Sequence, residues 1–166
     1  LYKGKLFELN AYHMQVEHRK VRREIIEHSG AAAMLAFDEK GKVLLVKQHR
    51  FPHGYILEIP AGTLEKREKP IDCAYREIIE ETGYEAKKMT KLISYFPSVG
   101  YNKEEIHIFV ASGTKKKFEL KLDNDEFITG VKMDIKKLIG MIKSGKIIDS
   151  KTICAVMIYA AKKKLL

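Results

Sequence analysis

The chain has 166 residues, of which 45% are apolar and 32% are charged, and 31 Lys and Arg against 22 Asp and Glu give it a formal charge of +9. This much apolar material excludes a disordered chain, and the length predicts one domain with at most a small appendage. No apolar stretch approaches the roughly 20 residues of a membrane span, no signal peptide is visible, and the lysines are scattered, so we expect a cytoplasmic protein with neither membrane nor nucleic acid as partner.

The first part of the chain is predicted to form β-strands. The turn at residues 38–41 joins two apolar strands into a hairpin. The expected strands cover residues 6–9, 12–16, 21–28, 31–37, 43–46 and 55–59. Pro60 ends the last of them, because proline has no N–H to donate to a neighbouring strand.

The hydrophobic period then changes, and residues 71–82 are predicted to form an amphipathic helix. Its apolar positions recur at helical spacing, at Ile71, Ala74, Tyr75 and Ile78. Pro70 suits the first turn of this helix, and Gly83 suits the left-handed position that follows its end.

The remaining elements are predicted to be strands followed by helices. The strands cover residues 89–96, 106–111 and 127–133, and the helices cover residues 135–144 and a segment capped by Asp149 or Ser150 that runs to Lys163. This order predicts an α/β (α+β) fold in which helices cover a mixed sheet.

Acidic residues gather in and around the predicted helix of this otherwise basic chain. Glu77, Glu80 and Glu81 share one face of the helix, away from its apolar side. Crowded carboxylates raise each other's pKa unless a cation lies among them, and a hard divalent metal is the usual cation. The alternative is a solvated acidic stripe, partly neutralised by Arg76.

The residues before the helix favour the metal site. The segment reads Gly62-x5-Glu68-x7-Arg76-Glu77-Ile78-x-Glu80-Glu81-x-Gly83-Tyr84. It resembles the signature of the Nudix hydrolases, GX5EX7REUXEEXGU, in which U is a bulky apolar residue, and only Tyr84 departs slightly from it. The resemblance implies an α/β/α sandwich that hydrolyses nucleoside diphosphates linked to another group, with Mg²⁺ or Mn²⁺ as cofactor.

The resemblance also implies roles for the residues of this segment. The metal ligands would be Glu77, Glu80, Glu81 and the backbone carbonyl of Ala61, which together would hold more than one ion per site. Glu80 and Arg76 would take part in catalysis. Glu68 would pair with Arg76 and fix the loop on the helix, while Gly62 and Gly83 would be supporting residues.

Other segments resemble the ADP-ribose pyrophosphatase group of this family. They are residues 57–62 (LEIPAG), 46–50 (VKQHR), 22–24 (RRE) and 96–101 (FPSVGY). Val99 stands where the group has a proline, which bears on the choice of substrate. The resemblance implies hydrolysis of ADP-ribose to AMP and ribose 5-phosphate.

The same resemblance assigns substrate contacts and an assembly. The substrate-binding residues would be Arg23, Arg50, Glu58, Ser98 and Glu104. A guanidinium matches the oxygens of a diphosphate, although a surface salt bridge is the alternative for each arginine. Residues 1–29 would be an N-terminal β extension that exchanges strands in a homodimer, and residues 30–166 would be the Nudix domain.

The general base in this group is a loop carboxylate before a late strand. The candidate loop is residues 122–126, with Glu126 as first choice and Asp123 as second. The alternative is a turn rich in Asp and Asn between two strands.

Other functions stay open on the sequence. The substrate could be another nucleotide sugar or dinucleoside polyphosphate, or the capped 5′ end of an RNA. The chain could also be a Nudix-like binding module without catalysis, although its intact acidic motif argues against this.

Overall fold

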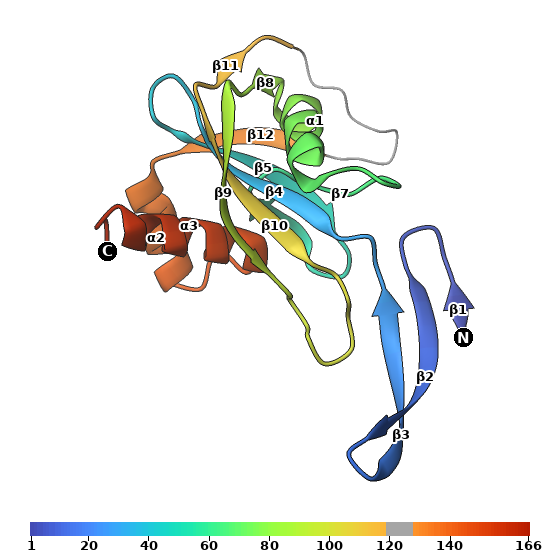
Figure 1. Ribbon diagram of the computed structural model, residues 1–166. Helices are drawn as coiled ribbons and strands as arrows, with labels where there is room; N and C mark the ends of the chain where they lie inside the picture. Colours follow the sequence, from blue (N-terminus) through green and yellow to red (C-terminus); the bar gives the residue numbers. More distant parts are fainter. Residues whose placement is uncertain (119–127) are drawn as a thin grey trace.

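The computed structural model describes residues 1–118 and 128–166, as drawn in Figure 1. Most of its elements are strands, and its three helices lie after the seventh strand and at the end of the chain. The elements are β1 (Tyr2–Lys3), β2 (Glu8–Val16), β3 (Arg19–Glu27), β4 (Ala31–Phe37), β5 (Val43–Arg50), β6 (Gly54–Glu58), β7 (Ala61–Thr63), α1 (Pro70–Thr82), β8 (Tyr84–Glu85), β9 (Lys88–Tyr95), β10 (Ile106–Ser112), β11 (Lys115–Lys116), β12 (Ile128–Met133), α2 (Ile135–Lys143) and α3 (Ser150–Lys162).

A seven-stranded mixed sheet forms the centre of the molecule. Its main path runs β12-β5-β4-β10-β9, with β6 paired to β5 and β7 paired to β4. β10 runs parallel to β4, and the other pairs in this sheet are antiparallel. β4 lies at the middle and is buried along nearly its whole length, which explains why its sequence is an unbroken apolar run.

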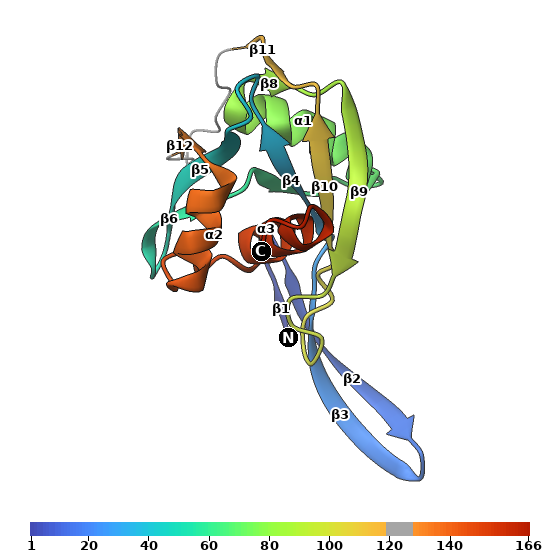
Figure 2. The ribbon, with the colours of Figure 1, turned by 90° about the vertical axis from the view of Figure 1, so that its left-hand side faces the viewer.

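Helices cover both faces of this sheet. Side chains alternate along a strand, so Ala32 and Met34 of β4 pack on the α1 side, whereas Ala33 and Leu35 pack on the side of α2 and α3. Figure 2 shows α2 and α3 on the face of the sheet opposite α1. The predicted α/β/α sandwich around a mixed sheet is therefore confirmed. Across the described residues, no helix has the length and apolar character to cross a membrane.

The long predicted elements are present, and the differences are local. Residues 6–9 and 12–16 were expected as separate strands, but most of them belong to the continuous strand β2. β5 continues beyond the predicted end at residue 46 to Arg50. The very short strands β1, β7, β8 and β11 were not predicted, because two or three residues carry no periodic signal. Residue 127, the predicted start of β12, lies outside the described residues.

The N-terminal strands form a separate three-stranded sheet, which we call the arm (β1 to β3). Figure 1 shows the arm projecting from the body of the molecule. Its base is tied to the loop before β10, because Ile26 N–H donates to the carbonyl of Tyr101 at 2.7 Å and Lys103 pairs with Glu27 at 2.7 Å. These contacts place the root of the arm beside the main sheet.

A buried polar contact joins α3 to the end of β6. The Asp149 side chain caps α3 by accepting the N–H and the hydroxyl of Thr152, at 2.9 and 2.6 Å. The Thr152 hydroxyl oxygen in turn accepts the N–H of Ile59 at 2.8 Å, and Thr152 is fully buried. This contact fixes the chain just before β7.

We expect Thr152→Val to lower the free energy of unfolding by about 1–3 kcal/mol, because the isosteric valine leaves the buried Ile59 N–H without an acceptor. Urea denaturation followed by circular dichroism measures the loss. Thr129→Val on the exposed side of β12 is the control, and its free energy of unfolding should change by less than about 0.5 kcal/mol. Equal small effects of both substitutions would contradict the role of this contact.

Candidate active site

The site is built where β7 meets the middle of α1. β7 pairs with β4 through Ala61 and Ala33, which sets the backbone of residues 61–63 against the acidic face of the helix. A Cβ atom at Gly62 would lie 1.8 Å from Oε1 of Glu77, so only glycine permits this approach. Gly83 ends the helix with φ of 71° and donates its N–H to the carbonyl of Ile79 at 2.8 Å.

Arg76 lies at the centre of the acidic cluster. Its Nε and Nη2 each donate to one oxygen of Glu68 at 3.0 Å, in a bidentate pair that fixes the loop before α1. Its Nη1 donates to Glu77 Oε1 at 2.6 Å and to Glu80 Oε2 at 3.0 Å. One guanidinium therefore hydrogen-bonds three carboxylates, offsets part of their negative charge and joins the loop to the helix.

The pKa values of these groups follow from the same contacts. Hydrogen bonds from Arg76 lower the pKa of Glu68, against the opposing effect of its burial. Hydrogen bonding to Glu68 raises the pKa of Arg76, and the charge of Glu77 adds to this effect. Beneath the loop, burial raises the pKa of the Cys73 thiol to about 12, so this cysteine stays a protonated core residue.

Carboxylate and backbone oxygens lie close together beside this cluster. Ala61 donates its N–H to Glu81 Oε2 at 2.9 Å, and Glu77 contacts the backbone at Gly62, so two carboxylates approach the peptide between β6 and α1. Carboxylate and carbonyl oxygens are the donors that Mg²⁺ and Mn²⁺ prefer. As the side chains stand, no group of three or more His, Cys, Asp or Glu in the described residues is close enough to hold a metal, because Glu77 and Glu80 turn toward Arg76.

A cleft of about 660 Å³ opens beside Glu77 and Glu81. Its walls come from β5, β7, α1, the first turn of α3, the root of the arm and the loop before β10. Polar or charged residues line much of this cleft, among them Gln48, Arg50, Glu77, Glu81, Glu104 and Lys151. This volume is typical of a site for a small organic ligand.

One wall of the cleft holds a buried carboxylate between two cations. Glu58 is 1% exposed and accepts Arg50 Nε at 2.8 Å and Arg50 Nη2 at 3.1 Å. Lys151 Nζ donates to Glu58 at 3.1 Å and to Asp149 at 2.6 Å. Burial alone lowers the pKa of Lys151, but the charges of Asp149 and Glu58 outweigh it and raise that pKa, which keeps the lysine protonated.

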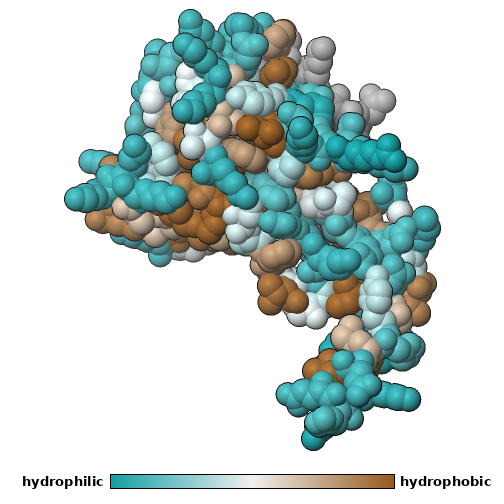
Figure 3. Space-filling model, viewed as in Figure 1, coloured by the Kyte–Doolittle hydropathy of each residue, from teal (hydrophilic) through white to brown (hydrophobic). Residues whose placement is uncertain are grey.

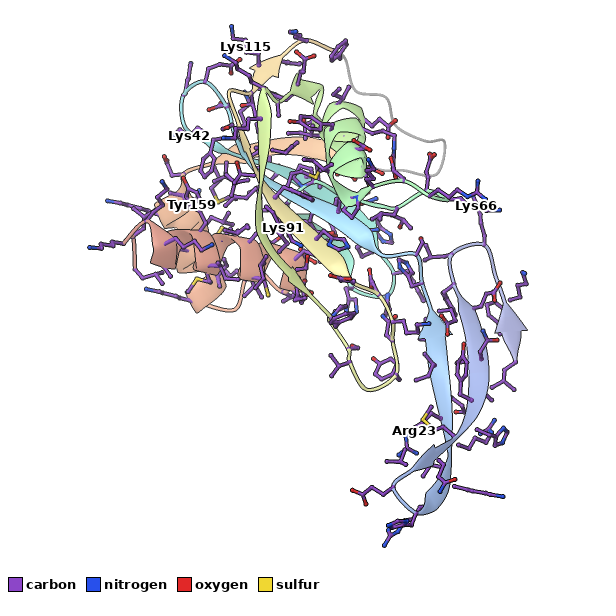
Figure 4. All side chains as sticks on the ribbon, viewed as in Figure 1. Arg23, Lys42, Lys66, Lys91, Lys115 and Tyr159 are labelled. Carbon is purple, nitrogen blue, oxygen red and sulfur yellow. The ribbon has the colours of Figure 1, made fainter. Side chains whose placement is uncertain are left out.

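The predicted substrate residues lie at different places. Arg50 and Glu104 line the cleft, whereas Glu58 lies behind Arg50 and outside the lining. Ser98 lies in the turn after β9, where its carbonyl accepts the N–H of Asn102 at 3.0 Å. Arg23 is exposed on β3, far down the arm from α1 in Figure 4. The predicted base residues Glu126 and Asp123 lie outside the described residues.

Gln48 and Lys151 are among the cleft residues that were not predicted from the sequence. Gln48 belongs to the segment 46–50 that resembles the ADP-ribose pyrophosphatase group, but only Arg50 of that segment was assigned a role. Lys151 did carry a signal, because a cation in the first turn of a helix opposes the helix dipole. Such a residue is expected where nearby carboxylates hold it.

The comparisons with known proteins agree with this geometry. A sequence model of the NUDIX domain matches residues 27–156. The ADP-ribose pyrophosphatase of Bacillus subtilis (strain 168) is 38% identical over 170 residues, covering 99% of this chain and 91% of that protein. The methanol dehydrogenase activator of Bacillus methanolicus is 40% identical over 159 residues, covering 94% and 86%. The GDP-mannose pyrophosphatase of Yersinia enterocolitica is 35% identical over 141 residues, covering 79% and 73%.

A solved structure supports the fold. The crystal structure of an ADP compounds hydrolase superposes with a TM-score of 0.83 at 16% identity, covering 99% of this chain and 90% of that one. The match of the family model over most of the chain, together with relatives of more than 30% identity along nearly its whole length, shows that this chain belongs to the NUDIX domain family.

Proposed function

We propose that the chain hydrolyses the diphosphate bond of ADP-ribose with water, giving AMP and ribose 5-phosphate. The observation that carries the proposal is the acidic cluster around Arg76 at the floor of a cleft of about 660 Å³. The relative from Bacillus subtilis, named an ADP-ribose pyrophosphatase and similar over 99% of this chain, supports the choice of substrate.

Divalent ions, Mg²⁺ or Mn²⁺ and more than one per site, complete this proposal. After Glu77 and Glu80 turn from Arg76, Glu77, Glu81 and the carbonyl of Ala61 would hold an ion, and Glu80 would hold a second or share the first. When bound, the ions would supply positive charge to the diphosphate and lower the pKa of a water molecule.

The chain's own residues would bind and orient the substrate. Arg76 fixes the loop before α1 through its bidentate pair with Glu68. Arg50, held in the cleft by Glu58, would direct donors to the phosphate oxygens. Glu126 would take the proton of the attacking water, with Asp123 as second choice, so that the water oxygen forms the new P–O bond while the bridging oxygen leaves.

The two cysteines support the proposed cytoplasmic location. Cys73 and Cys154 are both free, and Cys73 is buried. Unpaired thiols of this kind are typical of proteins from reducing compartments.

We also propose a homodimer in which residues 1–29 of each chain exchange strands with the other. Leu6, Met14 and Val16 of the arm are 60%, 43% and 49% exposed, and the nearby Val99 and Tyr101 are 82% and 55% exposed. Figure 3 shows apolar side chains along the arm and at its base. An apolar surface of this kind favours a protein partner, and a second copy would bring Arg23 toward the neighbouring site.

We predict that the chain with Mg²⁺ releases AMP from ADP-ribose faster than it hydrolyses GDP-mannose, other nucleotide sugars, dinucleoside polyphosphates or capped RNA. Liquid chromatography of the products measures each rate, and chelation by EDTA should abolish turnover because the carboxylates then lack their ions. Preferential hydrolysis of another substrate would redirect the substrate assignment. No turnover of any of them would favour a binding module.

We predict that Glu126→Gln lowers kcat by about 10²–10⁴-fold, because a neutral amide cannot accept the proton of water. Mn²⁺ affinity, measured by electron paramagnetic resonance, should stay unchanged, since the proposed ligands are untouched. Asp123→Asn is the matched comparison and should retain more activity. Unchanged turnover of Glu126→Gln would reject this assignment.

We predict that the protein elutes from gel filtration at about twice its chain mass of 19.1 kDa.

In the dimer, Arg23→Ala should raise KM about tenfold or more through loss of a charged hydrogen bond to substrate. Arg22→Ala is the control, because Arg22 pairs with Glu24 at 2.6 Å and faces the opposite side of β3. A species of 19.1 kDa only would contradict the dimer.

A further inference from the structure

The strand-side wall of the cleft carries polar groups beyond those already assigned. Gln48 and Arg50 reach it from β5, and Lys151 reaches it from the first turn of α3. These residues face the same cleft as Glu77 and Glu81, so a ligand held at the acidic cluster also contacts this wall.

Gln48 lines the cleft and carries a buried acceptor without a partner among the described residues. The residue is 8% exposed, and its Oε1 is buried without a hydrogen-bond partner among the described residues. Leu44 and Val46 precede it on the same face of β5 and are both buried. A buried amide oxygen at the end of this apolar row costs free energy unless a ligand donates a hydrogen bond to it.

The neighbouring cations Arg50 and Lys151 are paired with carboxylates, so they offer a ligand hydrogen-bond donors but little net positive charge. Arg50 uses Nε and Nη2 on Glu58, so that, within the described part of the chain, no protein acceptor binds its Nη1. Lys151 uses two of its three hydrogens, on Glu58 and Asp149. The charges of Arg50 and Lys151 thus balance those of two carboxylates. The same hydrogen bonds fix the orientation of the N–H groups that remain without a protein acceptor in the described residues.

We infer that Gln48, together with Lys151, forms a subsite for a sugar phosphate, in which the amide binds a sugar hydroxyl and the lysine binds a phosphate oxygen. A hydroxyl is the ligand group that can donate to Oε1 and also accept from the amide nitrogen. The phosphate beside it matches the N–H donors of Lys151 and Arg50. The inference rests on the proposed function and makes Gln48 a specificity-determining residue.

Hydrolysis of deoxy analogues by Gln48→Met tests the hydroxyl contact. Methionine keeps the length of the side chain but cannot form hydrogen bonds. We expect kcat/KM for ADP-ribose to fall about 10- to 100-fold, because the sugar hydroxyl of the substrate then has no hydrogen-bond partner in the subsite. An analogue that lacks the contacted hydroxyl should be hydrolysed equally by the wild-type protein and the variant.

Two sugars could supply this hydroxyl, and the analogues distinguish them. One series lacks the 2′- or 3′-hydroxyl of the adenosine ribose, and the other lacks a hydroxyl of the terminal ribose. The control is Lys47→Met, which changes an exposed residue on the other face of the same strand and should leave every kcat/KM unchanged. An equal loss on all analogues, or no loss on ADP-ribose, would overturn the subsite.

Product binding separates this inference from the proposed function. Isothermal titration of AMP and ribose 5-phosphate needs no turnover, so it applies even if ADP-ribose is not hydrolysed. One of these products should bind Gln48→Met about tenfold or more weakly than the wild-type protein, with unchanged thermal unfolding of the variant. If the wild-type protein and Gln48→Met bind each product with the same affinity, the role of Gln48 is refuted whatever the substrate.

The same titration tests Lys151. Lys151→Met should weaken binding of the same product about tenfold, whereas Lys162→Met, an exposed position on the same helix, should not. If Lys151→Met unfolds because Glu58 loses a partner, Lys151→Arg keeps the charge and should bind within a fewfold of the wild-type protein. Unchanged affinity of a folded Lys151→Met would remove the lysine from the subsite.

Discussion

The structure of the site depends on the guanidinium of Arg76. Glu77 and Glu80 lie within one turn of the same helix and repel each other, and Glu68 approaches from the loop before it. Arg76 hydrogen-bonds all three at 2.6–3.0 Å. Without this one cation, Glu68 would lose its bidentate partner on the helix and the acidic face would destabilise α1.

The fold brings two further elements to the same place. β7 pairs with the central strand β4, which carries Gly62 to within contact of Glu77. α3 comes from the end of the chain, and its residue Thr152 accepts the N–H of Ile59 just before β7. The segment between β6 and β7 is therefore held from both faces of the sheet, which fixes the acidic floor of the cleft relative to the cations of its wall.

Much of the fold could be predicted because its signals are local. The apolar run of β4, the period of α1 and the Asp149 cap of α3 each depend on neighbouring residues. The short strand β7 could not be predicted, since its position is set by pairing with β4 rather than by its own three residues. The two N-terminal segments joined into β2 because pairing with β3 continues through the residues between them.

The sequence by itself determined the acidic motif, the helix that presents it and the layered order of strands and helices. Only the tertiary structure decided what the other charged residues do. It buried Glu58 between Arg50 and Lys151, although Lys151 lies 93 residues away along the chain. It also left Gln48, which lines the cleft, with a buried oxygen that has no partner within residues 1–118 and 128–166. Helical spacing fixes contacts within a few residues, whereas contacts between β5, β6 and α3 exist only after the sheet and its covering helices have packed together.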